Sequence, residues 1–462
     1  MKKLITLVVA GCMVLGSLGT AAAVDVKVSG QWYFHYGYYS NLNMVEAKDK
    51  GTHADRTVAR QRVRTQIQFI ADENLSALLN LEANMNWGNR NGNVNGAGGA
   101  LDADQTTFVI KRAHLDWTIP NTQTKIRMGM QGITLPNAVF GNPVMNADVA
   151  GVMVSNQLTP EIGLNVFWAR PYDKGWNDEE NNQMDEMDMF GVILPIKTDV
   201  VRVTPWAMLA LIGKDSDFYN GNRNFNGGGV NFKRNPRNGD IDSDTYAWWG
   251  GVAFELPVLD PFFVKLDAMV GGLETGDSDY DTTGFLLATD IGYKFSFGSL
   301  SAFGFYGSGD DEIDDRGSMP IVSDDTGLSP TMLGFGGGRI RSIDGTVSNN
   351  GIGMWGVGLK LADLSFVENL SHTVTAMYAG GTNKGDSTVS RRDTHNGVLG
   401  GQFYMSSDRI YEVNLMNTYK ATENLLLSLD LAYVWMDLGD HWDNKDDTTG
   451  NFATMIGVQY SF

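Results

Sequence analysis

Alternation of apolar and polar residues is the feature of this sequence that most restricts its fold. From Val26 to Tyr38, apolar residues occupy every second position, with polar side chains such as Lys27 and Gln31 between them. Side chains of a β-strand point alternately to its two faces, so the pattern predicts a strand with one apolar and one polar face. These runs of about 10–14 residues exceed the usual strand length and suit tilted strands that cross a bilayer. Similar runs lie at 62–69, 75–87, 425–435 and 452–462.

Two kinds of connection alternate between these runs. Seventeen connections join eighteen strands, and an even number lets both termini meet at the turn end while the sheet closes. We therefore expect an all-β fold, a closed antiparallel transmembrane β-barrel of about 18 strands, or 16 if one strand has been divided in error. The eight short turns lie at 71–74, 120–123, 158–161, 195–199, 257–261, 297–299, 362–371 and 420–424. The nine longer loops, rich in Gly, Asn and Asp, lie at about 40–56, 88–105, 133–148, 171–185, 213–244, 275–282, 310–350, 381–408 and 437–450.

The first 23 residues have the features of a signal peptide. Lys2 and Lys3 form a basic start, residues 4–18 an apolar core, and Ala21-Ala22-Ala23 a small-residue cleavage site. Cleavage would leave residues 24–462 as a single barrel domain, exported through the inner membrane. Cys12 is the only cysteine and lies within this signal, so we expect no disulfide or thiol chemistry in the exported chain.

Charge and hydropathy argue against other classes of protein. The chain has 35 Lys+Arg against 54 Asp+Glu, a net charge of −19, whereas a nucleic-acid partner would require a basic face. After the signal, the longest apolar run, about 207–212, is far shorter than the roughly 20 residues of a spanning helix. A secreted β-sandwich would show the same alternation, but aromatic residues at strand ends, such as Trp87 and Trp435, are typical of the girdles of a membrane barrel.

The end of the chain carries a resemblance to a known family. Phe462 is the last residue, and Tyr460 and Ile456 precede it on the same predicted face. This pattern resembles the terminal aromatic signal, here Tyr460 and Phe462, by which the assembly machinery recognises Gram-negative outer-membrane barrels. The whole predicted barrel resembles the trimeric porins. The segments Arg127-Met128-Gly129-Met130-Gln131 and Leu135-Pro136-Asn137 are similar to those of the homotrimeric porins of sulfate-reducing bacteria.

Further expectations follow from that resemblance. It implies a homotrimer in the outer membrane of a Gram-negative bacterium, in contact with outer-membrane lipid. It also implies that the third long loop, about 133–148, folds into the pore as a constriction loop. The candidate residues of this loop are Leu135, Pro136, Asn137 and Phe140.

Basic residues gather on the polar faces of predicted strands near this loop. Facing the lumen, they would form a cationic wall that selects ions by charge. An alternative is that each arginine pairs with a lumenal carboxylate, such as Glu82 or Asp116, and only braces the wall. The loop from Ile133 to Met145 contains no acidic residue to oppose the wall, which favours small anions. The basic residues are Arg60, Arg62, Arg64, Arg112, Lys125 and Arg127.

Acidic residues concentrate in other loops. Asp277, Asp279 and Asp281 have the alternate spacing that can supply oxygen ligands to Ca²⁺, but no closing Glu completes such a site. We expect no cofactor, with a divalent ion on these loops as the weaker alternative. His114 and Asp116 could belong to a hydrolytic triad, yet no nucleophile motif accompanies them. We therefore expect no enzymatic activity.

Together these features predict an outer-membrane porin. It would form a passive, water-filled channel for small hydrophilic solutes, with a preference for anions. The main alternative is a substrate-specific channel, in which Tyr33 and Trp206 near the polar faces would line a sugar track. A barrel enzyme or a surface receptor is the weakest alternative.

Overall fold

Strands form nearly all of the regular structure in the part of the chain that the structure describes. The computed structural model describes residues 24–41, 55–90, 98–102, 108–173, 186–213, 244–276, 281–311, 317–322, 327–337, 347–348, 350–384, 404–442, 446 and 448–462. Within these ranges the one helix is a single 3-10 turn, η3 (Pro257–Leu259). None of the helical structure in the described ranges is long and apolar enough to span a membrane. The signal peptide expected over 1–23 lies outside them.

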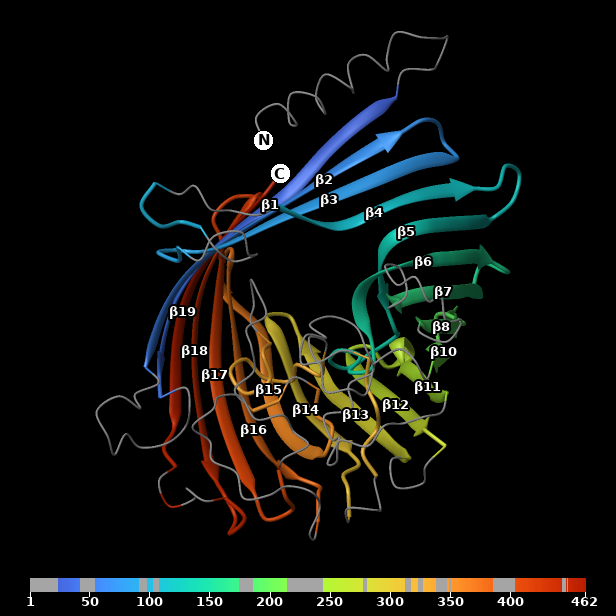
Figure 1. Cartoon of the computed structure of the whole chain (residues 1–462). Coiled ribbons are helices and arrows are strands. Elements are labelled where there is room, and N and C mark those ends of the chain that lie inside the picture. Colours follow the sequence, from blue (N-terminus) through green and yellow to red (C-terminus); the bar gives the residue numbers. More distant parts are fainter. Residues whose placement is uncertain are drawn as a thin grey trace.

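The strands follow one another around a single sheet (Figure 1). The first are β1 (Asp25–Ser40), β2 (Arg56–Ile70), β3 (Leu75–Asn86), β4 (Phe108–Thr118), β5 (Thr124–Thr134), β6 (Asn146–Gln157), β7 (Gly163–Asp173), β8 (Glu186–Ile193), β9 (Ile196–Lys197) and β10 (Arg202–Ile212). The others are β11 (Thr245–Glu255), β12 (Phe262–Glu274), β13 (Thr282–Phe295), β14 (Gly298–Gly307), β15 (Met354–Val367), β16 (Leu370–Gly381), β17 (Arg409–Lys420), β18 (Leu425–Asp437) and β19 (Asn451–Ser461).

The barrel consists of eighteen strands and not sixteen. The short segment β9 pairs with the same edge of β10 as β8 does, so the two are one strand interrupted at Leu194-Pro195. Proline has no N–H to donate to a neighbouring strand, which accounts for the interruption. The nineteen segments therefore make eighteen strands, as the count of connections predicts. The turn expected at 195–199 is displaced, because β9 extends through Lys197 and the backbone N–H of Thr198 bonds to the carbonyl of Val201.

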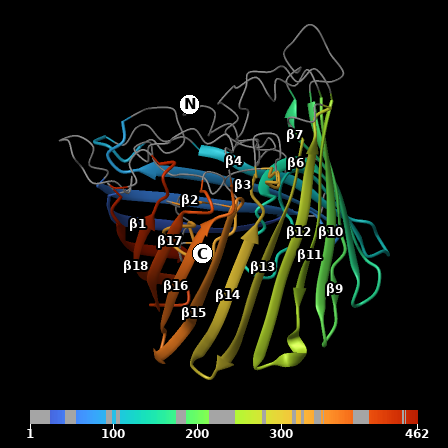
Figure 2. The ribbon, with the colours of Figure 1, turned by 90° about the horizontal axis from the view of Figure 1, so that it is seen from below.

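The sheet closes on itself. β1 pairs antiparallel with β2 along one edge and with β19 along the other, and every neighbouring pair of strands is antiparallel. The predicted closed antiparallel barrel is thus confirmed. Figure 2 shows β10–β14 side by side, with the short turns gathered at one end of the barrel.

Apolar side chains lie on the outer surface of the barrel, as the alternation predicts. In β1, Val28 is 56% exposed and Tyr36 is 54% exposed, whereas His35 between them is buried on the inner face. Aromatic rings on the outer surface form two contiguous rows, with neighbouring centroids 4.8–5.6 Å apart. Such rows have the arrangement of interface girdles. One row, near the turns, contains Phe262, Tyr293, Phe295, Phe297 and Phe366; the other contains Trp355, Tyr378, Tyr411, Trp435 and Tyr433.

The connection after β5 folds into the barrel. Its residues Ala138 and Val139 donate backbone N–H groups to Asp267 of β12, and Phe140 packs edge-on against Phe303 of β14. The segment proper is 135–145, shorter than the predicted loop of 133–148, because β5 continues to Thr134 and β6 begins at Asn146.

The connection after β14 also turns inward. Its described part, within 317–337 and 347–353, bonds to the inner face of β17, where Glu412 accepts the backbone N–H groups of Leu333 and Gly334. It joins the first inward segment through the N–H of Val322 and the carbonyl of Val144. These segments and the inner faces of neighbouring strands share one buried apolar cluster. The inside of the barrel is therefore partly filled with protein.

One predicted turn is too long. The segment 362–371 was expected to be a connection, but β15 continues to Val367 and β16 begins at Leu370. The pairing of these strands is irregular between Leu361 and Val367, and this irregularity breaks the simple alternation from which strand ends are predicted.

Candidate functional site: a cationic wall inside the barrel

The register of β1, β2 and β3 places three arginines on the inner face. Arg64 lies opposite Gln31 of β1 and Glu82 of β3, and Arg62 lies opposite Tyr33 and Asn84. Residues directly opposite one another in an antiparallel pair point to the same side of the sheet. The predicted face of Arg60, Arg62 and Arg64 is therefore the face that the structure gives them.

Glu82 is shared by two of these arginines. Its Oε2 atom accepts the Nε–H of Arg64 at 2.6 Å and lies 3.7 Å from Nε of Arg62, while only 3% of its side chain is exposed. Arg62 also donates to the amide oxygen of Asn84. A carboxylate buried this deeply requires charged partners, so Glu82 holds both guanidinium groups against the wall.

A β-bulge in β4 brings Lys111 and Arg112 together. Ile110 pairs with Leu81 and Arg112 with Asn80, so Lys111 is an extra residue in the ladder. Both cations reach Asp148 of β6, at 3.1 Å from Nζ of Lys111 and 2.6 Å from Nε of Arg112. Regular alternation would have put these neighbours on opposite faces, and only the bulge lets both of them bind one carboxylate.

The ion pairs to Asp148 cross a place where two strands separate. β4 pairs with β5 only as far as Met130, whereas β5 pairs with β6 to its last residue, Thr134. Gly129 bends the strand there with φ of +119°, and a Cβ atom at this position would collide with the carbonyl oxygen of Ala113. Arg112 and Lys111 of β4 thus bridge directly to β6.

A third carboxylate binds the two remaining predicted cations. Asp116 accepts two hydrogen bonds from Arg127, at 2.7 and 2.8 Å, and lies 2.8 Å from Nζ of Lys125. His114 instead contacts the carbonyl oxygen of Met130. The His114–Asp116 pair considered for hydrolysis is therefore not formed.

The cations outnumber the acids on this wall. The wall has seven basic side chains and three carboxylates, and each carboxylate binds two of the basic side chains. In the described part of the chain Arg60 has no carboxylate partner. Bracing and excess positive charge therefore coexist, with a local formal charge of +4. The basic residues are Arg60, Arg62, Arg64, Lys111, Arg112, Lys125 and Arg127, and the acids are Glu82, Asp116 and Asp148.

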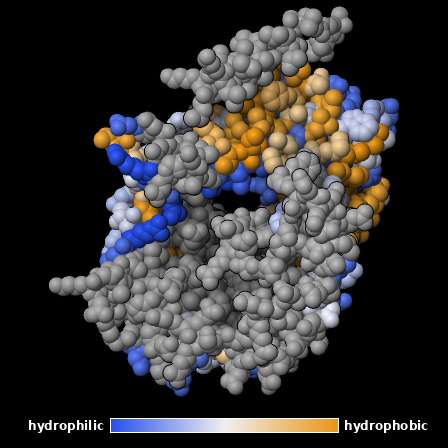
Figure 3. Space-filling model, in the orientation of Figure 1, coloured by the Kyte–Doolittle hydropathy of each residue, from blue (hydrophilic) through white to orange (hydrophobic). Residues whose placement is uncertain are grey.

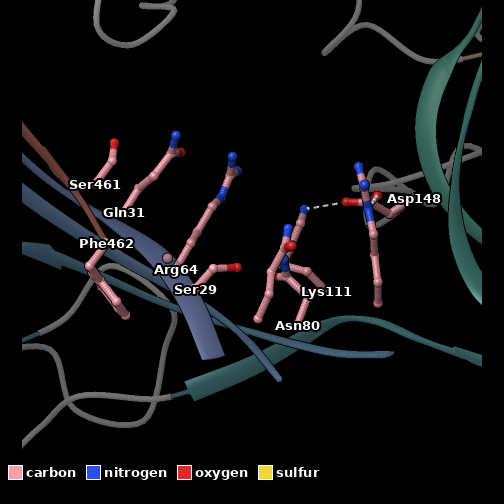
Figure 4. A pocket seen from close by; sticks show the side chains of 11 residues that line it. Ser29, Gln31, Arg64, Asn80, Lys111, Asp148, Ser461 and Phe462 are labelled. Carbon is pink, nitrogen blue, oxygen red and sulfur yellow. Dashed lines mark hydrogen bonds and ion pairs between the residues drawn. The ribbon is translucent and has the colours of Figure 1, made fainter. Parts of the chain in front are cut away.

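Part of the wall lines an open cavity of about 370 Å³. Figure 4 shows Gln31, Arg64 and Ser461 pointing to one side of the sheet, Phe462 pointing to the other, and Lys111 reaching toward Asp148. Gln66 and Asn80 complete a lining rich in N–H donors. Such a lining can bind an anionic or strongly polar solute. Figure 3 shows the molecule hollowed beside β1–β4, with hydrophilic residues along the edge of the hollow.

The structure also places the remaining predicted residues. Leu135 is buried, Phe140 contacts Phe303, and the carbonyl of Pro136 accepts a hydrogen bond from Asn142. Asn137 lies in the same inward segment. Tyr460 and Phe462 stack at 5.9 Å on the outer surface, and both are more than 40% exposed. The side chain of Trp206 is only 5% exposed, so it offers no open aromatic track.

The acidic metal candidates are only partly described. Asp277 and Asp279 lie outside the described residues, and Asp281 accepts hydrogen bonds from the backbone and hydroxyl of Thr275. Among the described residues, no three His, Cys, Asp or Glu side chains are grouped so as to bind a metal.

Sequence reasoning missed Lys111 as a member of the wall, together with the partners of Asp148 and the role of Asp267. Lys111 adjoins Arg112, and alternation assigns only one of two neighbours to the lumen. A possible signal was the pair Ile110 and Ala113, two apolar residues three apart, which breaks the period of two and indicates a bulge. No pattern in the sequence indicates that Asp267 binds the backbone of Ala138 and Val139.

The fold and the wall define a class, a closed antiparallel barrel of eighteen strands with a cationic wall on one part of its inner face. Solved structures with this fold include Pseudomonas aeruginosa OccK5 (OpdH), at 12% identity and a TM-score of 0.53, covering 95% of this chain and 98% of that one. Pseudomonas aeruginosa OccK9 (OpdG) is 11% identical with a TM-score of 0.54, covering 95% and 99%. Acinetobacter baumannii OccAB3 is 10% identical with a TM-score of 0.53, covering 94% and 99%. No protein-family model and no curated protein matches the sequence.

Proposed function

We propose that this chain is an outer-membrane porin, a passive water-filled channel that prefers anions among small hydrophilic solutes. The barrel fold and the apolar outer surface with its two aromatic rows support the location in the outer membrane. The signal peptide expected over 1–23 would export the chain through the inner membrane. Eighteen strands with a partly filled interior leave room for a narrow aqueous path.

The excess of basic side chains on the wall is the observation that supports the proposed preference for anions. Seven basic side chains against three carboxylates give the wall a local charge of +4, although the whole chain has a charge of −19. Ions in the path lie within a few ångströms of the wall, and low-dielectric protein focuses its field. Loop carboxylates farther away than roughly 8 Å are screened at physiological ionic strength.

The inward segment 135–145 is proposed as the constriction. It extends from β5 to contacts with β12 and β14, and so crosses the inside of the barrel. Its described residues carry no acid, so the cationic wall is not opposed from this side. The resemblance of 127–131 and 135–137 to homotrimeric porins supports a trimer in contact with outer-membrane lipid. The terminal Tyr460 and Phe462 support recognition by the assembly machinery.

Bilayer recording tests this function. The purified protein in a planar membrane should form open channels, and in a gradient of KCl the reversal potential should have the sign of a chloride-selective pore. A reversal potential of the opposite sign would contradict the anion preference. Absence of any conductance from correctly folded barrels would contradict the porin function itself.

A substrate-specific channel is the second candidate, and the donor-lined cavity of about 370 Å³ favours it. A shaped site binds its solute, whereas a wide pore only sieves. Saturable block of the current by one anionic solute, but not by others of equal size and charge, would favour the specific channel.

A further inference from the structure

A second cavity, open to its surroundings, lies at the turn end of β10–β15. Its volume is about 890 Å³, and side chains from neighbouring strands line it. Figure 2 shows these strands side by side, with η3 at their turn end. Four basic and four acidic residues contribute to the lining, so its formal charge is zero. They are Arg202, Lys265, Lys294, Lys360, Glu255, Asp260, Asp290 and Asp363.

Most of these charges already have partners. Glu255 lies 3.4 Å from Arg202 and 3.8 Å from Lys265. Lys294 lies 2.7 Å from Asp260. Asp363 donates its backbone N–H to the hydroxyl of Thr373 at 3.3 Å and has a further interaction. Apart from these six residues, one acidic and one basic side chain of the lining remain.

Asp290 of β13 is the unmatched acid. It is 7% exposed, and its buried Oδ1 atom has no hydrogen-bond partner in the protein. Lys265 stands directly opposite it in the ladder, but its ammonium group lies toward Glu255. An unpaired carboxylate in a buried position is costly, and a donor group from a solute would relieve that cost.

Lys360 of β15 is the unmatched cation. Its ammonium group lies over the rings of Phe140, at 5.6 Å, and Phe303, at 5.7 Å. It forms no ion pair with any carboxylate of the described chain. Cation–π contacts hold the ammonium group in place but leave its N–H groups able to bind an anion.

The register sets the separation of these two charges. Asp290 pairs with Phe303 of β14, and Lys360 pairs with Ser301 of the same strand. β13 and β15 are therefore two strand spacings apart, roughly 10 Å between backbones, and the long lysine side chain shortens the gap between the charges. A solute that contacts both Asp290 and Lys360 must therefore have its own two charges several ångströms apart.

We propose that this cavity binds a zwitterionic solute, with its ammonium group on Asp290 and its anionic group on Lys360. A solute with a single charge would leave one of the two residues unmatched in a cavity that is otherwise neutral. The inference rests on the proposed function only for the route by which a solute arrives, and it extends that function by naming a substrate class.

Calorimetric titration of the whole protein in detergent micelles tests the proposal without measuring conductance. The probes are 6-aminohexanoate, hexanoate and hexylammonium, which share a chain length and differ in charge. We expect saturable binding of 6-aminohexanoate, and binding of each singly charged probe weaker by about tenfold or more, the effect of one charge-assisted hydrogen bond. Equal binding of hexanoate or of hexylammonium would overturn the proposal, as would no binding of 6-aminohexanoate.

Variants identify the residues. Asp290→Ala and Lys360→Met should each weaken binding of 6-aminohexanoate by about tenfold, and Asp290→Asn, which keeps the size of the side chain, should do the same if Asp290→Ala does not fold. Lys294→Met is the matched control, because Lys294 lines the same cavity but is paired with Asp260. Unchanged binding in the Asp290 and Lys360 variants, or equal loss in Lys294→Met, would overturn the proposal. The sign of the reversal potential tests the anion preference separately.

Discussion

Asp267 of β12 binds the backbone of Ala138 with one carboxylate oxygen, at 2.7 Å, and that of Val139 with the other, at 2.9 Å. Asp267 is 1% exposed and stands on the inner face of the strand. A single side chain thus fastens the segment proposed as the constriction to a distant part of the barrel wall.

Removing this clamp should widen the channel. Asp267→Ala leaves two backbone N–H groups without acceptors, at about 1.5–3 kcal/mol for each hydrogen bond to a charged group, so segment 135–145 should loosen. Single-channel recording should show higher or fluctuating conductance. Asp267→Asn keeps one acceptor oxygen and should have an intermediate effect. Unchanged conductance in Asp267→Ala would show that this segment does not limit the pore.

The charge of the wall should set ion selectivity. Replacing Arg62 and Arg64 with Glu reverses two lumenal charges beside Glu82, so the reversal potential in a KCl gradient should shift toward cations. Replacing both with Gln should shift it less in the same direction. The control is Asp311→Asn, on the connection after β14, where its partner is the exposed Lys384; it should leave the potential nearly unchanged. Equal shifts in the double variants and the control would contradict local control of selectivity.

Removing a carboxylate from the wall should have the opposite effect. Asp148→Asn leaves Lys111 and Arg112 without their shared partner and raises the local charge from +4 to +5. Bilayer recording should therefore show a stronger preference for anions. Asp260→Asn, which leaves Lys294 unpaired at the turn end, is a control of the same chemistry away from the wall. A shift toward cations in Asp148→Asn would refute the assignment.

The last residue should be needed for assembly. Deleting Phe462 removes the terminal aromatic of the predicted signal, so the amount of protein in the outer membrane should fall while synthesis is unchanged. Immunoblots of membrane fractions measure this. Phe366→Ala is the matched control, because Phe366 is also an exposed outer aromatic near the turns. If both variants reach the membrane at wild-type levels, the signal is assigned wrongly.

The oligomeric state should be a trimer. The resemblance to the homotrimeric porins implies a closed threefold assembly, so extraction in mild detergent should yield a particle of about three times the monomer mass. Boiling should convert it to monomers. Light scattering combined with chromatography measures the mass, and a monomer under the gentlest extraction would rule out the trimer.

The barrel could be predicted because its strands are recognised from the residues of each strand alone. Alternation along β1, from Val28 to Tyr36, fixes which side chains face outward, and the rhythm of turns and loops fixes the number of strands. Arg62 and Arg64 could likewise be assigned to the inner face, because β2 is regular and each residue reports its own side of the sheet.

The neighbours of those residues depended on tertiary structure. Lys111 joins the wall only through a bulge, and its partner Asp148 comes from β6, across the point where β5 leaves β4. Asp267 and Ala138 are far apart in sequence, as are Asp290 and Lys360. The alternation within a single strand is enough to determine the face on which a residue lies. Ion pairs and cavities require side chains from separate strands to meet, and only the closing of the sheet and the inward folding of its loops bring them together.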